Sequence, residues 1–259
     1  EVVFEAAQGA DAREMLLMVI VMTVHSFSEG VAVGVAFGGG ITLATVITIA
    51  IAIHNIPEGV AISAVLRSGD MLKVWSLGES DSSEKELVQR FFDGLERFTP
   101  TLVSWNGSGF DLPVLHYRAL LQGVQCPRYW ENGDDDREFR WNNYLSRFHS
   151  RHTDLMDVLA GYQARANAPL DEIATLLGFP GKMGMSGAKV WDNFMAGDIE
   201  GIRDYCETDV LNTYLVYLRY QLMRGRLMPE SYERECDRVR EMLGTSDKAH
   251  LQAFLKEWD

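Results

Sequence analysis

Three side chains have types and spacing that could support metal-dependent chemistry. Asp111 follows a glycine-containing turn at residues 104–110, where an apolar run gives way to a predicted helix. Tyr205 and Asp209 are four residues apart, so they share one face of a helix. Carboxylates bind divalent cations, and a phenol beside a carboxylate can position a water molecule held by the cation. Taken singly, each also has a structural explanation, a helix N-cap for Asp111 and an ordinary hydrogen-bonded pair for Tyr205 and Asp209.

A second set of potential metal ligands is repeated within the first sixty residues. Residues 25–30 read HSFSEG and residues 54–59 read HNIPEG. In each segment a histidine and a glutamate are four apart and project from one helix face, His25 with Glu29 and His54 with Glu58. An imidazole and a carboxylate directed to a common point form a ligand set for a transition metal. Pro57 would in addition free a backbone carbonyl one turn earlier.

The region that carries this repeat is far more apolar than the rest. Residues 15–37 and 41–66 each exceed the roughly 20 apolar residues needed to cross a bilayer. Three glycines at 38–40 connect them, and between residues 15 and 66 the only formally charged side chains are Glu29 and Glu58. The sequence therefore predicts a two-helix transmembrane hairpin. An ionised side chain at mid-bilayer costs about 2.5 to 3.5 kcal/mol, which favours a metal site over a purely structural role.

The net charge restricts how the chain could bind nucleic acid. Of the total of −13, residues 1–70 carry two basic and seven acidic residues, a net −5, which leaves −8 for the remainder. A basic phosphate-binding surface is therefore not expected, and a bound cation would have to supply positive charge. The three cysteines lack a C-x-x-C pair, which argues against a disulfide framework or a structural zinc site and favours a reducing, cytoplasmic compartment for the soluble part.

Beyond residue 70 the apolar residues come in short periodic groups that predict a single α/β domain. Strands are expected at residues 72–77 and 101–105, with an amphipathic helix at 83–98 between them and only one sheet. A polar loop is expected around residues 132–137. The other predicted helices cover residues 111–123, 170–177, 198–225, 230–243 and 248–258.

The segment around Asp111 and, later in the chain, the segment Tyr205–Asp209 resemble the second and third motifs of DEDDy 3′-5′ exonucleases, which have a ribonuclease H-like fold. Residues 176–191, 205–219 and the H-x-D-L-M-D segment at 152–157 are similar to predicted exonucleases related to the proofreading domain of family B DNA polymerases. The resemblance implies two Mg²⁺ or Mn²⁺ ions, held in part by Asp111 and Asp209, with Tyr205 orienting water. It also implies that Asp154 is a secondary site residue and that the substrate is a single-stranded 3′ end of nucleic acid.

The resemblance also points to a missing part of the exonuclease. In this class a D-x-E motif on the first strand supplies two of the four metal-binding carboxylates, and here the predicted hairpin occupies that place. Glu5 follows a short apolar run, but the residues after it do not continue such a motif. We therefore predict a ribonuclease H-like exonuclease domain that lacks its N-terminal strand, with impaired or absent activity. An inert, tethered binding module is a further interpretation.

Residues 1–69 resemble helices four and five of the ZIP family of zinc and iron transporters. The resemblance implies a Zn²⁺ site formed by His25, Glu29, His54 and Glu58, with Ser26 and Asn55 at a neighbouring secondary position. Alternating access needs more spanning helices than two. The competing function is accordingly a zinc-transporter fragment, embedded in the lipid bilayer through residues 15–66 and joined near Gly69 to the nuclease-like domain at 71–259.

Overall fold

The structure is a computed structural model that describes residues 61–258, apart from the side chain of Ala188. These residues belong to one compact unit, Gly59–Asp259. Its elements in chain order are β1 (Ser63–Ser68), β2 (Met71–Ser76), α4 (Glu84–Phe98), β3 (Leu102–Ser104), α5 (Asp111–Gln122), α6 (Pro127–Trp130), the 3-10 turn η2 (Arg137–Arg140), β4 (His152–Asp154), α7 (Leu155–Leu159), the 3-10 turn η3 (Ala164–Ala166), α8 (Leu170–Leu176), α9 (Gly187–Met195), α10 (Ile199–Met223), α11 (Pro229–Gly244) and α12 (Ala249–Trp258).

The described strands form two short sheets, where the sequence predicted one. β1 and β2 pair as an antiparallel hairpin, in the register Ser63 opposite Ser76. Gly69 begins the connecting turn with a φ of 56°, a left-handed conformation that glycine adopts without strain. β3 and β4 pair in parallel, which places Ser104 beside Asp154 at the carboxyl ends of both strands. The β3–β4 pair therefore brings together two segments that are about fifty residues apart in the chain.

The prediction of a transmembrane hairpin is wrong where the structure describes it. The last residues of the predicted second span lie in β1, and Arg67 of this strand makes two hydrogen bonds of 2.7 Å to Glu235 of α11. Among residues 61–258, no helix combines the length and the apolar character that a membrane crossing requires. Residues 15–60, which hold the remainder of the predicted hairpin, lie outside the described residues. We correct the fold class to an α/β domain with no transmembrane hairpin assigned to it.

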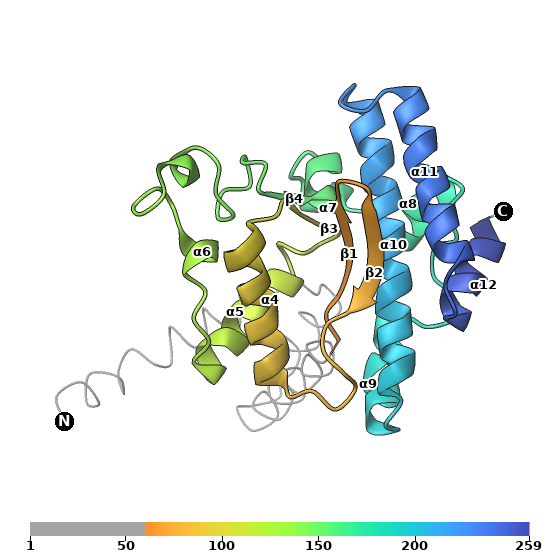
Figure 1. Ribbon diagram of the computed structural model, residues 1–259, viewed down its shortest axis with the longest axis horizontal. Helices are drawn as coiled ribbons and strands as arrows, with labels where there is room; N and C mark the ends of the chain where they lie inside the picture. Colours follow the sequence, from red (N-terminus) through yellow and green to blue (C-terminus); the bar gives the residue numbers. More distant parts are fainter. Residues whose placement is uncertain (1–60, 259) are drawn as a thin grey trace. The chain divides into compact units, whose positions relative to one another are not determined.

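The long helix α10 is the central element of the domain. Figure 1 shows the β1–β2 hairpin lying along it, with α11 and α12 packed beside it and α4 and α5 beyond the hairpin. Leu211 and Leu215 of α10 are fully buried and pack with residues of α7, α11 and α12. A second apolar cluster joins α4, α5 and α6 around Phe92 and Leu115. Tyr205, earlier on α10, packs against a smaller cluster of Ala61, Val190 and Ile202.

Most described helices begin and end close to the predicted residues, because local signals determine their ends. Ser83 caps α4 by accepting a hydrogen bond from the backbone N–H of Glu86, and Gly123 ends α5 in a left-handed conformation. The side chain of Asp198 caps α10 at Gly201. α9 and β4 were not predicted from the sequence. The short β4 depends on its pairing with β3, which no local pattern reveals.

Candidate functional site

Asp111 is presented by a tight loop between β3 and α5. Asn106 adopts a φ of 62°, and its carbonyl oxygen accepts hydrogen bonds from the backbone N–H groups of Gly109 at 3.1 Å and Phe110 at 2.9 Å. A Cβ atom at Gly107 would collide with the side chain of Ser104, so the loop requires glycine there. The chain leaves this loop at Asp111, the first residue of α5.

Asp154 holds this loop in place. Its carboxylate accepts hydrogen bonds from the backbone N–H groups of Asn106 at 2.9 Å, Ser108 at 2.8 Å and Met156 at 3.1 Å. The residue is buried, with 5% of its surface exposed, and it is also the N-cap of α7. The predicted secondary site residue therefore lies next to Asp111, where its oxygens serve the backbone of the Asp111 loop.

Tyr205 and Asp209 lie on consecutive turns of α10, with a hydrogen bond between their side chains. Burial raises the pKa of the Asp209 carboxyl above its ordinary value. The hydrogen bond from Tyr205 and the positive charge of Lys182 act in the opposite direction. Tyr205 thus stabilises the ionised form of Asp209, the form that binds a cation.

The negative charges of Asp154 and Asp209 act on the carboxyl of Asp111. Burial raises the pKa of Asp111 to about 6 against a backbone hydrogen bond that lowers it, and the negative charges of Asp154 and Asp209 add to the increase. The residue as a whole keeps an exposed surface, so water screens part of this effect and can reach the site. A divalent cation stabilises the ionised form of a carboxylate whose pKa is raised by burial and by nearby negative charge. Asp111 and Asp209 therefore fit a metal-binding role.

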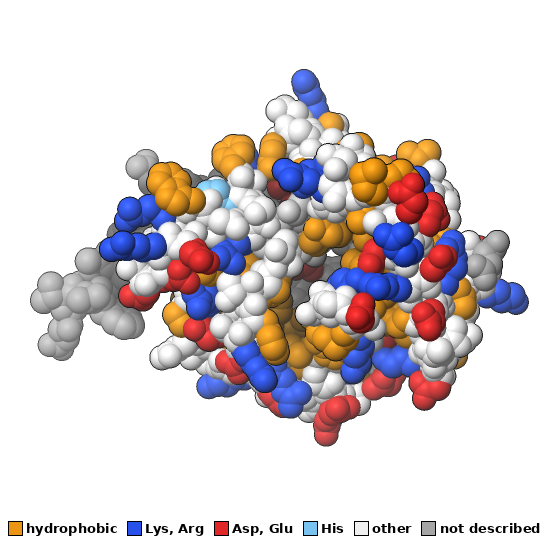
Figure 2. Space-filling model, turned by 45° about the horizontal axis from the view of Figure 1, so that its top comes forward, with side chains coloured by type: hydrophobic (Ala, Val, Ile, Leu, Met, Phe, Trp, Pro, Cys, Tyr) orange, Lys and Arg blue, Asp and Glu red, His pale blue; other side chains and the backbone are white. Residues whose placement is uncertain are grey.

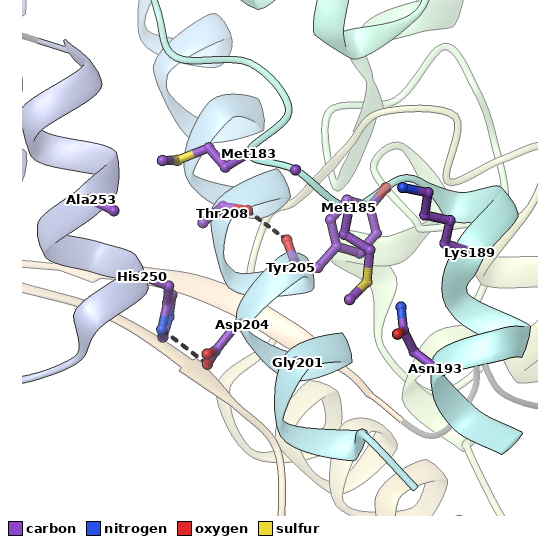
Figure 3. A pocket seen from close by; sticks show the side chains of 11 residues that line it. Met183, Met185, Lys189, Asn193, Gly201, Asp204, Tyr205, Thr208, His250 and Ala253 are labelled. Carbon is purple, nitrogen blue, oxygen red and sulfur yellow. Dashed lines mark hydrogen bonds and ion pairs between the residues drawn. The ribbon is translucent and has the colours of Figure 1, made fainter. Parts of the chain in front are cut away.

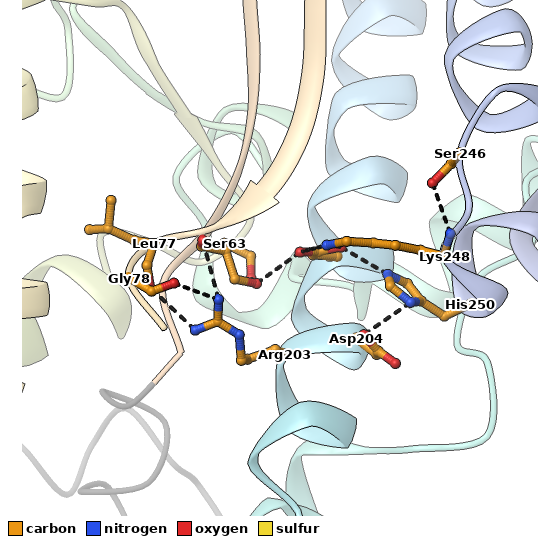
Figure 4. Close-up of polar contacts among 10 residues, drawn as sticks. Ser63, Leu77, Gly78, Arg203, Asp204, Ser246, Lys248 and His250 are labelled. Atoms are coloured by element: carbon orange, nitrogen blue, oxygen red, sulfur yellow. Dashed lines mark hydrogen bonds and ion pairs between the residues drawn. The ribbon is translucent and has the colours of Figure 1, made fainter. Parts of the chain in front are cut away.

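A separate polar cluster lies on the neighbouring face of α10 (Figure 4). Ligand atoms of Asp204, Glu207 and His250 lie within 4.8 Å of one another, the single such group of three found in residues 61–258. Glu207 is 1% exposed and lies 2.8 Å from His250 Nε2, 2.8 and 2.9 Å from Lys248 Nζ and 3.1 Å from Ser76 Oγ. Burial alone would raise its pKa, but the hydrogen bonds from His250 and Lys248 outweigh burial and hold the pKa at about 2. Through these hydrogen bonds the Glu207 carboxylate on α10 connects β2, the residue before α12 and α12 itself.

A cavity of about 430 Å³ opens beside Tyr205 between α9, α10 and α12. Figure 3 shows Lys189 and Asn193 projecting from α9 toward it, with the thioether of Met185 beside the Tyr205 ring. An amine, a carboxamide and soft apolar surface are thus available next to the phenol. The space has the size range of a small-ligand pocket.

The structure places some of the predicted site residues near one another and does not describe others. The structure brings Asp154 and Asp209 close enough to Asp111 for their charges to act on it. The residues of the predicted zinc site lie outside the described residues: His25, Ser26, Glu29, His54, Asn55 and Glu58. The sequence analysis did not identify Lys189, Asn193 or the Glu207 cluster. Glu207 lies two residues from both Tyr205 and Asp209, so the sequence could have suggested it as a site residue. Its partners Lys248 and His250 are about forty residues away, and no spacing pattern points to them.

The described residues form an α/β domain in which Asp111 and Asp209 are candidate metal ligands. The chain belongs to the family described as predicted 3′-5′ exonucleases related to the exonuclease domain of PolB, which matches residues 52–258. The match begins within the predicted second span. A stretch of 42 residues is 45% identical to DNA polymerase 1 of Sulfurisphaera ohwakuensis, and it covers 16% of this chain and 5% of the polymerase. No solved structure gives a significant match.

Proposed function

We propose that this protein is a divalent-metal-dependent 3′-5′ exonuclease acting on single-stranded nucleic acid, with low activity. The observation that carries the proposal is the arrangement of Asp111 and Asp209, delivered by a glycine-dependent loop and by α10, within a chain of this exonuclease family. Asp111 and Asp209 would hold Mg²⁺ or Mn²⁺. When bound, the metal supplies activation of the attacking water and stabilisation of the leaving oxygen.

The other residues of the site have distinct tasks in this proposal. Tyr205 keeps Asp209 ionised through their hydrogen bond and orients water with its hydroxyl. Asp154 positions Asp111 by holding the backbone of its loop. Lys189 and Asn193 line the adjacent cavity, where the amine would pair with a phosphate of the terminal nucleotide and the carboxamide with its base.

The proposed low activity follows from the small number of acidic ligands. No Asp-x-Glu segment occurs in the printed sequence before β1, so the pair of carboxylates that the family resemblance places there has no counterpart in that region. Two divalent ions would bring four positive charges to Asp111 and Asp209 alone, and weak binding of at least one ion follows.

The test is a nuclease assay of the full chain with Mn²⁺, on a single-stranded oligonucleotide labelled at its 5′ end. We expect slow shortening from the 3′ end that is abolished by Asp209→Asn and by EDTA. Asp192→Asn is the matched control, because Asp192 is an exposed aspartate on the neighbouring helix α9. Equal degradation by the wild type and the Asp209→Asn variant would remove the enzyme proposal.

A further inference from the structure

Residues 137–151, between α6 and β4, form a locally basic and aromatic segment in an acidic chain. The segment holds four arginines and one glutamate, a net charge of +3, whereas the whole chain carries −13. It also holds four aromatic residues, Phe139, Trp141, Tyr144 and Phe148. Interleaved basic and aromatic side chains are the composition of surfaces that bind single-stranded nucleic acid.

The segment divides its aromatic side chains into two groups. Phe139 is 0% and Tyr144 is 2% exposed, so both belong to the core with α4 and α5. Trp141 is 80% and Phe148 is 75% exposed. Exposed aromatic rings forgo the stabilisation that burial would provide, and two of them on one basic segment indicate a binding surface.

Hydrogen bonds fix the backbone that carries these exposed rings. The side-chain oxygen of Asn142 accepts from the backbone N–H groups of Ser150 at 3.0 Å and Arg151 at 3.1 Å, which closes the loop between the two rings. The side-chain oxygen of Asn143 accepts from the backbone N–H of Ser146 at 3.0 Å. The guanidinium of Arg151 lies 3.9 Å from the Phe139 ring centre and anchors the loop to the core. The rings are therefore presented by an ordered loop.

A cluster of Arg147, Phe148 and Tyr162, with the two rings edge to face, connects this loop to the helix α7. The guanidinium of Arg147 lies 5.0 Å from the Phe148 ring centre and 5.1 Å from that of Tyr162, whose hydroxyl donates to the Arg147 carbonyl at 2.8 Å. Tyr162 follows α7, the helix capped by Asp154, and Asp154 also holds the Asp111 loop. Figure 2 shows basic and apolar side chains gathered at the upper left of that face, on the side where Figure 1 places the α6–β4 loop.

We propose that Trp141, Phe148 and Tyr162, together with Arg140 and Arg147, form a stacking surface that binds single-stranded nucleic acid upstream of the cleaved end. Bases would stack on the aromatic rings, and the two exposed arginines would pair with phosphates. The exposed rings together with the net charge of +3 at residues 137–151 favour a polyanion with unstacked bases, although residues 131–136 just before them carry four acidic side chains. The inference rests on the proposed function in that it names how the substrate of that site is held.

Binding can be measured without catalysis. The full chain in EDTA and about 50 mM NaCl is titrated into a fluorescent oligothymidylate of about 20 nucleotides, and anisotropy gives Kd. We expect the double variant Trp141→Ala, Phe148→Ala to weaken binding about tenfold or more. Arg147→Gln should lower the slope of log Kd against log salt concentration by about one. A duplex of the same length should bind more weakly than the single strand, because its bases are already stacked.

Phe98→Ala is the matched control, because Phe98 is 66% exposed and lies 4.9 Å from the Arg97 guanidinium at the end of α4. This variant should bind within about twofold of the wild type. Equal Kd values for the double variant and the control would overturn the stacking surface. Binding of anionic phospholipid vesicles that depends on Trp141 and Phe148, without such dependence for the oligonucleotide, would also overturn it. If the chain shows no nuclease activity but its oligonucleotide binding depends on Trp141 and Phe148, this inference holds and only the proposed function is refuted.

Discussion

At the scale of single residues, three aspartates that lie near one another have different environments and different tasks. Asp154 is saturated by three backbone donors, so its oxygens maintain structure. Asp209 receives a hydrogen bond from Tyr205, and Asp111 has no protein cation among the causes that act on its pKa. Asp154, with three backbone donors, is a positioning residue, whereas Asp111 and Asp209, with fewer donors, are candidate metal ligands.

Asp111→Asn should stabilise the metal-free fold while removing activity. The folded-state pKa of Asp111, about 6, lies above its ordinary value of 3.8, so the fold favours the protonated carboxyl and loses stability as pH rises through about 6. Because the residue is exposed, we expect a gain of less than about 1 kcal/mol at pH 8. Denaturant unfolding of both proteins in EDTA measures the gain. A difference that persists unchanged near pH 4 would contradict this assignment.

At the scale of elements, the β3–α5 loop and the β4–α7 junction act as one unit. The parallel pairing sets Ser104 beside Asp154, and the Asp154 carboxylate then reaches across to the loop. The Ser104 hydroxyl also lies 2.8 Å from Nε2 of His152, a further contact between the strands. The Asp111 loop is therefore ordered by a strand that the sequence alone did not predict.

Asp154→Ala should release the loop that presents Asp111. Two backbone N–H groups of the loop would lose their acceptor, and α7 would lose its N-cap. We expect a loss of about 3 kcal/mol in the free energy of unfolding, together with lower nuclease activity. Asp154→Asn, which keeps the side-chain carbonyl as an acceptor, should fall between the alanine variant and the wild type. An alanine variant of wild-type stability would show that the loop holds its shape without Asp154.

Glu207→Gln should destabilise the docking of α12 in a pH-dependent manner. The folded-state pKa of Glu207, about 2, lies below its ordinary value of 4.5, so its contribution is complete above about pH 4.5 and is lost as pH falls toward 2. We expect a loss of about 3 kcal/mol at pH 7 that shrinks progressively below pH 4.5. Unfolding curves at several pH values measure it. Glu257→Gln, at an exposed position of α12, is the control and should change stability by less than about 0.5 kcal/mol.

At the scale of the whole molecule, the β1–β2 hairpin is an integral part of the domain. β1 and β2 both pack on α10, and Arg67 joins β1 to Glu235 of α11, which also accepts a hydrogen bond from Tyr214 at 3.2 Å. The pairing uses an apolar segment that hydropathy alone assigns to a membrane. The domain therefore extends before Gly69, where the change in composition predicted the boundary between two domains.

Arg67→Ala should weaken the attachment of β1 to α11. The Arg67 and Glu235 side chains are 24% and 16% exposed, and both hydrogen bonds involve two charged groups. We expect a loss of about 2 kcal/mol in unfolding free energy and a similar coupling energy in a double-mutant cycle with Glu235→Ala. The exposed pair Arg90 and Glu86 should give less than about 0.5 kcal/mol in the same cycle. Equal coupling energies for the two pairs would contradict the structural role of Arg67.

The sequence by itself determined the features that depend on neighbouring residues. Apolar periodicity located most of the helices, and spacing placed Tyr205 and Asp209 on one face of α10. Only the tertiary structure decided that residues 63–68 form a strand, that β4 pairs with β3, and that Glu207 binds Lys248 and His250 at the start of α12. The physical reason is that a strand or a buried ion pair is stabilised by partners distant in the chain. Local hydropathy and spacing contain no record of those partners.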